Sequence, residues 1–422
     1  ATDAIMLGWI DQTSLSAVSL AGQVQFVLSL FISGIAAGAG IMAAQYWGKQ
    51  DAASIEKVIP IALRTNLLFS GLFTILAGFC PEMLMRIFTN DAALVASGSQ
   101  YLRAVALSYV LCGISQVYLI LLKNTGHAAV SSRISSTAVV LNIILNAILI
   151  YGLCGAPALG IRGAAYATVA ARVVELIWAY LETKKPERVR ILWNRLFSSA
   201  GKILSEDFWR YTLPVLAASL VWGIAYVLYS VIMGHMGSDA VAANSITSIA
   251  KSLLSCLIRG VSGGAGVLIG NLLGADELEK AREYGGRLTH LAIAIGVVTG
   301  GLLMLISPAI VHFAPLTDTA AEYLQYMLLF CGLNLMAQSV NTTVLDGIFC
   351  AGGDAKFDMQ GNIGAMWCFS VPLGFLAAFW LKLPVMVVYC IVNLDEIVKL
   401  PAVYLHYKKY VWVRNITRDI EE

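Results

Sequence analysis

The residues best suited to chemistry are ionisable and amide side chains that stand inside apolar segments of the chain. The first is Asp3, in the segment DAIMLGWI. A charge at the centre of a bilayer costs roughly 2.5–3.5 kcal/mol by insertion scales, so a carboxyl group kept there is a candidate functional residue. Such a group can exchange a proton when a cavity opens to either side, or it can hold a sodium ion or an organic cation. Alternatively, Asp3 lies near the end of a helix and simply faces water.

Two amides, Asn142 and Asn146, stand in the apolar segment VLNIILNAILIYG. Residues four apart are neighbours on one face of a helix, so both side chains point the same way. Taken alone, the pair is also what hydrogen bonding between two helices would require.

A third group of polar residues lies in the second half of the chain. Lys251, Ser255 and Arg259 recur every four residues and therefore share a helix face. Three cations and three anions within apolar segments predict mutual pairing. Two hypotheses remain open: the network lines a cavity and helps to bind substrate or relay a proton, or it only holds the helices together. Its members are Lys251, Ser255, Arg259, Asp346, Asp395, Glu396 and Lys399.

The composition places these residues in a membrane protein. Hydrophobic residues make up 58% of the 422 residues and charged ones 13%, with a mean hydropathy of +0.75; soluble proteins carry roughly 25% charge. The net charge of +2 and the scattered basic residues argue against a nucleic-acid partner. The eight cysteines contain no C-x-x-C pair, so they predict neither a disulfide framework nor a metal site.

Apolar runs of about 20 residues, each long enough to cross a bilayer core, recur along the chain. The predicted fold class is an all-α integral membrane protein with twelve transmembrane helices, of which the first is truncated in this chain. The predicted helices cover residues 1–10, 15–47, 58–80, 98–122, 134–152, 161–181, 209–235, 241–273, 287–310, 321–349, 359–381 and 385–406. The predicted domains are an N-lobe at 1–181, a linker at 182–208, a C-lobe at 209–406 and a tail at 407–422.

Lysine and arginine gather in alternate connections, above all in the segment 182–210 and in the tail. The positive-inside bias therefore predicts that these segments and the C-terminus are cytoplasmic.

The chain contains an internal repeat. The stretch SGIAAGAGIMAAQYWGKQD at 33–51 returns as RGVSGGAGVLIGNLLGADE at 259–277, displaced by 226 residues. A phosphate-binding loop would need a strand before it; these glycines lie in long apolar segments, where small residues let helix backbones approach closely. The predicted helix-packing glycines are Gly34, Gly38, Gly40, Gly260, Gly264 and Gly266.

Six spans return the chain to its starting side, so both halves share one orientation. Two six-helix lobes of this kind are related by a pseudo-twofold axis along the membrane normal. The second half opens its first helix near Pro214, and the counterpart of that residue would lie about a dozen residues before Ala1. The repeat therefore predicts that the first helix begins before Ala1.

With these features the chain resembles the multidrug and toxic compound extrusion (MATE) family, in its prokaryotic branch. The likeness is carried by DAIMLGWI at 3–10, GAPALGIRGAAYAT at 155–168, GVLIGNLLGADELEKAREYG at 266–285, AGGDAKFDMQGNIGAMWCFSVPLGFLAAF at 351–379 and NLDEIVKLPAVYLHYKKYVWVRNIT at 393–417. It covers essentially the whole chain. The resemblance implies secondary efflux transport through a central cavity, by alternating access driven by a proton or sodium gradient.

The resemblance also implies roles for the N-lobe residues. Asp3 matches the family's cation-coupling Asp, and Asn142 matches the first position of its Asn-x-x-x-Asp pattern. Asn146 stands where the family often has Asp, so one negative charge is lost and proton coupling through Asp3 is favoured over tight sodium binding. In the C-lobe, Trp222 and Ser339 stand where one branch of the family has acidic residues, which implies that the sodium site of that branch is absent.

The function expected from the sequence is antiport of organic, cationic and amphiphilic compounds against protons or sodium, with no cofactor. Expected partners are a small-molecule substrate and membrane lipid, with the chain acting as a monomer in the bacterial inner membrane. The first alternative is a flippase or exporter of lipid-linked or anionic substrates, which Lys251 and Arg259 favour slightly. An integral membrane transferase is the alternative from another class, but the five histidines are scattered along the sequence.

Overall fold

The computed structural model describes residues 6–7, 12–155, 157–191, 193, 196, 201–314 and 316–419. Within these residues, every regular element is a helix. A bilayer interior offers no water to backbone N–H and C=O groups, so a spanning segment must pair them internally, as a helix does. Nine helices among the described residues are long and apolar enough to cross a membrane. The all-α membrane architecture predicted from the sequence is confirmed.

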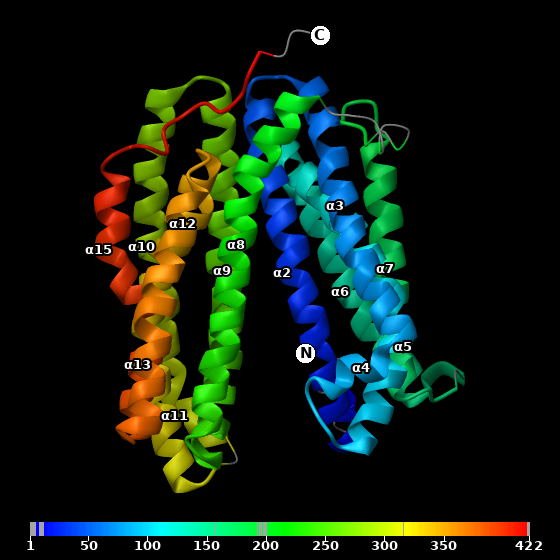
Figure 1. Ribbon diagram of the computed structural model, residues 1–422, viewed down its shortest axis with the longest axis vertical. Helices are drawn as coiled ribbons and strands as arrows, with labels where there is room; N and C mark the ends of the chain where they lie inside the picture. The colour runs from blue at the N-terminus through cyan, green and yellow to red at the C-terminus, as the bar shows by residue number, and fades with distance from the viewer. Residues whose placement is uncertain are drawn as a thin grey trace. The chain divides into compact units, whose positions relative to one another are not determined.

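The chain divides into two compact units. Unit 1 comprises Ala1–Ala43 and Asp51–Thr212, and unit 2 comprises Ala44–Gln50 and Leu213–Glu422. Within unit 1, α5 packs against both α3 and α7, and α7 packs against α6 (Figure 1). The described elements up to the start of α8 are α2 (Gln12–Gly48), α3 (Ala52–Phe79), α4 (Pro81–Arg86), α5 (Ala92–Leu122), η1 (Lys123–His127), α6 (Ala128–Tyr151), η2 (Leu153–Gly155) and α7 (Ile161–Thr183).

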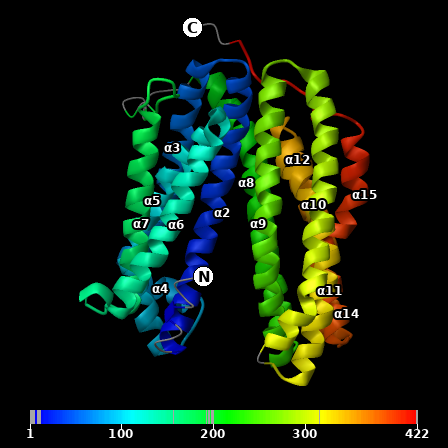
Figure 2. The ribbon, with the colours of Figure 1, turned by 180° about the vertical axis from the view of Figure 1, so that it is seen from behind.

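In unit 2, three long helices, α9, α10 and α11, pack against one another (Figure 2). The described elements from α8 onward follow in chain order, and the first turns of α8, up to Thr212, belong to unit 1. These elements are α8 (Lys202–Gly234), α9 (Ser238–Gly274), α10 (Leu278–Phe313), α11 (Asp318–Thr342), η4 (Thr343–Phe349), α12 (Ala355–Asn362), η5 (Ile363–Ser370), α13 (Val371–Phe375), η6 (Leu376–Trp380), α14 (Val385–Val392) and α15 (Asp395–Tyr407).

The predicted spans correspond to helices, with three differences. The predicted helix 1–10 falls mostly outside the described residues. The predicted linker 182–208 is shorter in the structure, because α8 already begins at Lys202. The predicted helix 385–406 is broken into α14 and α15 at Asn393 and Leu394. Asn393 has φ −100° and ψ 12°, and its side chain donates to the Tyr389 carbonyl at 3.0 Å, a local bond that competes with helical pairing.

The internal repeat is visible in the backbone of each unit. Helices α2 and α9 end at Gly48 and Gly274, which are 226 positions apart. Each is followed by a non-glycine residue with positive φ, Gln50 at 65° and Asp276 at 60°. Farther along, Gly126 has φ 80° and Gly353 has φ 74°. Because these conformations are uncommon, their recurrence at matching positions shows that the two halves repeat in structure as well as in sequence.

Some of the predicted packing glycines lie at close contacts. Gly34 is buried. A Cβ added at Gly38 would lie 2.3 Å from Thr212 Oγ1, and one at Gly40 would lie 3.0 Å from Asn124 Nδ2. At Gly266 the nearest atom, Gly347 O, is 3.4 Å away, which is ordinary contact.

Two of the predicted glycines need a correction. Gly260 and Gly264 have no atom within 4 Å of an added Cβ, so packing inside unit 2 does not explain them. The tightest approach of this repeat lies farther along the helices. A Cβ at Gly48 would lie 2.0 Å from Asn271 O, and one at Gly274 would lie 1.8 Å from Gln45 O. These two glycines occupy equivalent positions of the repeat, so the ends of α2 and α9 cross with their backbones in contact.

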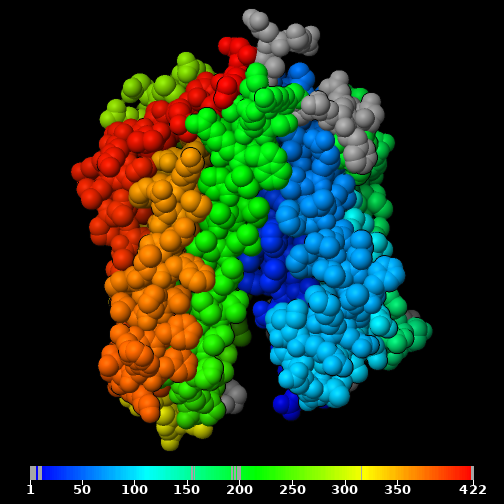
Figure 3. Space-filling view, viewed as in Figure 1, coloured from blue at the N-terminus to red at the C-terminus, as the bar shows by residue number. Residues whose placement is uncertain are grey.

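The tail after α15 holds this crossing in place. The side chain of Gln45 donates to the carbonyls of Ala351 (2.7 Å) and Arg414 (3.2 Å) and accepts from the backbone N–H of Ile416 (2.8 Å). Trp412 is fully buried, and a Cβ at Gly352 would lie 1.8 Å from its carbonyl oxygen. The tail, red in Figure 3, therefore packs as part of unit 2. These contacts explain why Ala44–Gln50 belongs to unit 2 while the rest of α2 belongs to unit 1.

The glycine crossing yields a test of stability. Gly48→Ala and Gly274→Ala should each destabilise the protein by about 1–3 kcal/mol, because the added methyl group meets backbone atoms that cannot rotate away. Gly260→Ala, in the same helix as Gly274, is the matched control; with open space around it, the change should be neutral or stabilise by up to about 1 kcal/mol. The measurement is the temperature at which detergent-solubilised protein loses its monodisperse size-exclusion peak. Equal effects of all three substitutions would contradict the crossing.

Candidate functional site

In unit 1, the two predicted amides lie together on α6. Asn146 is fully buried and donates from Nδ2 to Asn142 Oδ1 at 3.3 Å. Asn142 in turn donates to Thr168 Oγ1 on α7, also at 3.3 Å. The shared helix face predicted from their spacing is therefore present, and it connects α6 to α7. This arrangement fits the structural interpretation of the amides and leaves their part in a cation site as a prediction.

The third predicted member, Asp3, lies outside the described residues. The structure does describe Met6 and Leu7 nearby in sequence. The Tyr151 hydroxyl donates to the Met6 carbonyl at 2.6 Å, and Leu7 is fully buried. Two residues that closely follow Asp3 in the sequence are thus held inside unit 1, next to the end of α6.

One further charged pair is buried in unit 1. Arg172 and Glu175, three residues apart on α7, form an ion pair at 2.6 Å, and Glu175 also accepts from the Ser115 hydroxyl at 3.0 Å. Only 2% of the Glu175 side chain is exposed. With its charge paired and a second hydrogen bond made, this carboxylate serves the packing of α5 against α7.

In unit 2, Lys399 is the centre of a buried polar cluster. Its ammonium group donates to Glu396 Oε1 and to Asn362 Oδ1, both at 3.1 Å, and lies 3.9 Å from Asp395 Oδ2. Glu396 also accepts from Asn341 Nδ2 at 2.8 Å. The predicted residues Asp395, Glu396 and Lys399 are therefore brought together by the first turns of α15.

Three members of this cluster were not identified from the sequence. Asn341 on α11 is one, and the others are Asp358 and Asn362 on α12, where Asn362 donates to Asp358 Oδ1 at 3.1 Å. All three are buried. The spacing of Asp358 and Asn362 by four residues was available in the sequence as a polar helix face. It was not recognised because the segment AKFDMQGN is polar enough to resemble a connecting loop.

Lys251 and Ser255 contact α11 without meeting a carboxylate. Lys251 Nζ donates to Asn334 Oδ1 at 3.0 Å, and Asn334 Nδ2 donates to the carbonyl of Asn393 at 2.6 Å. The Ser255 hydroxyl lies 3.5 Å from Gln338 Oε1, at the limit of a hydrogen bond. This face of α9 is therefore connected to the break between α14 and α15 through amides.

Three of the charged residues do not make the direct ion pairs that the sequence predicts, among the residues that the structure describes. Within the described parts of unit 2, Lys251, Arg259 and Asp346 form no ion pair. Lys251 reaches an amide instead, and the Arg259 guanidinium lies 5.7 Å from the ring centre of Trp222, a cation–π distance. Asp346 lies in η4, a π-helical turn that packs against α9, where Ser262 donates to the Thr342 carbonyl at 2.8 Å. Of the three predicted cations, Lys399 is the one that pairs with carboxylates among the described residues.

Comparison with known proteins places this helical chain in a family. The family model MatE matches residues 1–148 and 214–376. The chain belongs to the MatE family. Among similar curated proteins are the uncharacterised transporter YisQ of Bacillus subtilis, 21% identical over 98% of this chain and 90% of that protein, and the probable multidrug resistance protein NorM of Agrobacterium fabrum, 24% identical over 90% and 82%.

Solved structures agree with this assignment. One is the outward-facing conformation of a multidrug resistance MATE transporter of the MOP superfamily, with a TM-score of 0.87, 20% identity and coverage of 97% of this chain and 90% of that one. Another is the Vibrio cholerae MATE transporter VcmN in its bent form, with a TM-score of 0.84, 16% identity and coverage of 97% and 91%. The protein therefore has the twelve-helix MATE fold predicted from its sequence. It is a multi-pass membrane transporter of an efflux family.

The Lys399 cluster yields a prediction about stability. Lys399→Met should lower the free energy of unfolding by about 3–5 kcal/mol, because Glu396 and Asp395 then remain buried without a counter-charge. Adding Glu396→Gln should restore part of that loss, since one unpaired charge is removed. The measurement is thermal unfolding of both variants in detergent. If Lys399→Met melts with the unchanged protein, the cluster does not hold the bundle together.

Proposed function

We propose that the protein exports organic compounds, cationic amphiphiles in particular, in exchange for protons by alternating access. Membership of the MatE family supports export. The observation that carries the choice of coupling ion is the hydrogen-bonded amide pair of Asn142 and Asn146. No cofactor is needed in this proposal, because the gradient of the coupling ion supplies the energy.

The charge of the proposed site favours protons over sodium. Sodium is a hard cation that prefers several oxygen ligands, with carboxylates compensating its charge. In the proposed site Asp3 is the sole carboxylate, because Asn146 is neutral and its Nδ2 already faces Asn142. One carboxylate can carry one proton without further ligands. The proposed coupling residues are therefore Asp3, with Asn142 and Asn146 shaping its surroundings.

A second candidate is export of lipid-linked or anionic substrates. The observation in its favour is that Lys251 and Arg259 have no carboxylate partner within the described part of unit 2. A cation in an apolar segment that lacks an internal partner can serve a negatively charged ligand. The related proteins are transporters rather than enzymes, so a membrane transferase is not proposed.

Several properties complete the proposal. The protein acts as a monomer surrounded by lipid in the bacterial inner membrane, with its C-terminus in the cytoplasm as the distribution of lysine and arginine favours. Its functional lobes are residues 1–181 and 209–406, joined by the linker 182–208 and followed by the tail 407–422.

The coupling proposal is tested by transport. Full-length protein in liposomes loaded with a fluorescent organic cation should move that cation when a pH gradient is imposed, and a sodium gradient alone should have no effect. Asp3→Asn should abolish the response to pH, because the amide cannot exchange a proton at these pH values. Transport under sodium alone would overturn the choice of ion. A folded protein that moves no cation under either gradient would favour the anionic substrates.

A gain-of-function variant tests whether the missing carboxylate at Asn146 is the reason why protons rather than sodium are the coupling ion. Asn146→Asp restores a second carboxylate beside Asn142, so the variant should acquire a response to a sodium gradient that the unchanged protein lacks. Asn142→Asp is the matched control, because it adds the same charge one turn away. If both variants remain indifferent to sodium while they still respond to pH, the missing carboxylate is not what decides the coupling ion.

A further inference from the structure

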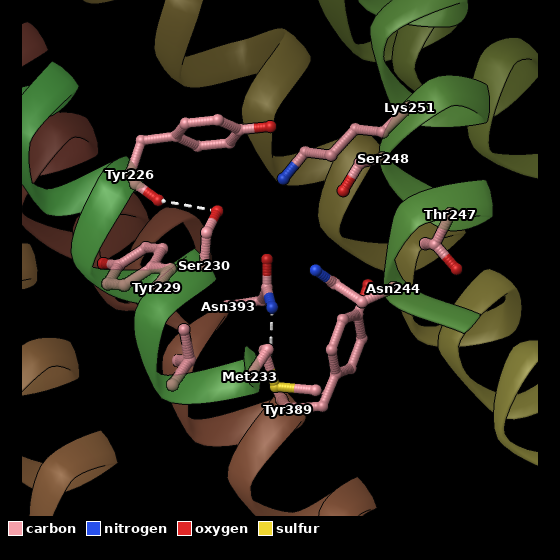
Figure 4. A pocket seen from close by; sticks show the side chains of 11 residues that line it. Tyr226, Tyr229, Ser230, Met233, Asn244, Thr247, Ser248, Lys251, Tyr389 and Asn393 are labelled. Carbon is pink, nitrogen blue, oxygen red and sulfur yellow. Dashed lines mark hydrogen bonds between the residues drawn. The ribbon is translucent and has the colours of Figure 1, made fainter. Parts of the chain in front are cut away.

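A small polar pocket lies between α8, α9 and the end of α14, wholly inside unit 2 (Figure 4). Figure 4 shows the side chains of Lys251, Asn244, Ser248 and Asn393 pointing toward one space. The pocket holds about 40 Å³. That is room for a water-sized ligand or for one functional group of a larger molecule, whereas whole drug-sized ligands occupy pockets of roughly 300–1,000 Å³.

The donors of this pocket gather on α9. Lys251 uses one of its three N–H groups for Asn334 Oδ1 and has no carboxylate partner among the described residues. The side chains of Asn244 and Ser248 have no hydrogen-bond partner within the same part of the chain. An ammonium, an amide and a hydroxyl on one helix face are the groups that bind a carboxylate or another small anion.

The other polar groups of the pocket are already partly occupied. Ser230 donates to the Tyr226 carbonyl at 3.3 Å, and Asn393 donates its Nδ2 to the Tyr389 carbonyl, which leaves Asn393 Oδ1 facing the space as an acceptor. A water molecule or an N–H or O–H group of the ligand can donate to that oxygen. The pocket therefore has a cationic donor side on α9 and a neutral acceptor side opposite.

Two acidic residues lie close by in sequence and need to be considered. Asp395 and Glu396 follow Asn393 closely, and a free negative charge there would repel an anion. Lys399 lies 3.1 Å from Glu396 and 3.9 Å from Asp395, so one ammonium is shared by two carboxylates, and Asn341 donates a further hydrogen bond to Glu396. Lys251 also attracts both carboxylates electrostatically, beyond ion-pair distance. Neither residue lines the pocket. Among the described residues that line it, Lys251 carries the one formal charge, and that charge is positive.

The charge is also specific to one half of the chain. At the repeat offset of 226, the counterpart of Lys251 is Gln25, which is uncharged. A packing role shared by both halves would not require a cation in only one of them. The lysine is thus a feature of unit 2 that the repeated architecture does not explain.

We propose that this pocket binds the carboxylate group of exported compounds, so that the substrates include organic acids and zwitterions in addition to simple cations. The anion could also be chloride, which shares the same chemistry. That the pocket receives transported compounds rests on the proposed export function, whereas binding of a carboxylate to the pocket does not. In this arrangement Lys251 pairs with the carboxylate, Asn244 and Ser248 donate to it, and the apolar body of the compound remains outside the pocket.

The test is equilibrium binding to the purified full chain in detergent, without any gradient. Sodium benzoate and benzamide have the same ring and differ in charge, so benzoate should bind and benzamide should not. Lys251→Gln should weaken benzoate binding by about tenfold or more, as expected for the loss of a charge-assisted hydrogen bond. Lys280→Gln, which removes a lysine that is 61% exposed on α10, is the matched control and should leave binding unchanged.

The other possible results of these binding experiments would overturn the proposal or identify a different anion. If benzoate binds equally to the unchanged protein and to Lys251→Gln, or if benzamide binds as well as benzoate, the proposal is wrong. A chloride titration at constant ionic strength, with gluconate replacing chloride, distinguishes a substrate carboxylate from chloride as the bound anion. Competition between chloride and benzoate supports a shared anion site. Chloride binding without benzoate binding overturns the substrate assignment. Because no transport is measured, a failure of the export proposal would leave benzoate binding intact, whereas a failure here would leave proton-driven export of simple cations intact.

Discussion

The ammonium group of Lys399 is the charge on which the interior of unit 2 depends. It lies within 3.1 Å of Glu396 and Asn362 and 3.9 Å from Asp395, so it determines how the first turns of α15 approach α12. The carboxylates gathered there would otherwise repel one another in a low dielectric. The break at Asn393 and Leu394 belongs to the same arrangement, because it places Asp395 and Glu396 in the first turn of a helix, where the helix dipole favours negative charge.

Each unit contains a buried ion pair between two residues of one helix, and the residues that form it differ between the units. In unit 1 a cation on α7, Arg172, pairs with Glu175 three residues later, and in unit 2 Lys399 on α15 pairs with Glu396 three residues earlier. In each case a side chain from another helix, Ser115 on α5 or Asn341 on α11, donates to the carboxylate. A buried ion pair is stable only when its remaining hydrogen-bonding capacity is used, so each pair fixes the position of a neighbouring helix. These contacts fit a structural role for both ion pairs.

The sequence predicted the features that depend on local pattern, which are the helices and the internal repeat. The length and apolarity of each run predicted the helices, and the displacement of 226 residues matches the ends of α2 and α9 at Gly48 and Gly274. It did not predict which side chains contact each other between helices, because those contacts depend on which helix faces meet. Asn341, Asp358 and Asn362 lie far from Lys399 in sequence and close in space. Of the predicted packing glycines, Gly38 and Gly40 lie at close contacts, whereas Gly260 and Gly264 do not. The tightest contact of the repeat is at Gly48 and Gly274, since helices that cross touch over only a few residues.

The polar network predicted from the sequence thus separates into two groups of charged residues that differ in their contacts. Asp395, Glu396 and Lys399 are buried and contact one another, and Glu396 and Lys399 also make hydrogen bonds to amides. Lys251 contacts an amide and Arg259 an aromatic ring, and among the described residues neither lies within ion-pair distance of a carboxylate. Because a charge in an apolar segment is costly, these two cations are the candidates for a functional role. Among the described residues, the charged side chains of α15 are therefore joined in ion pairs, and the two cations on α9 are the ones that the proposed function assigns to a ligand.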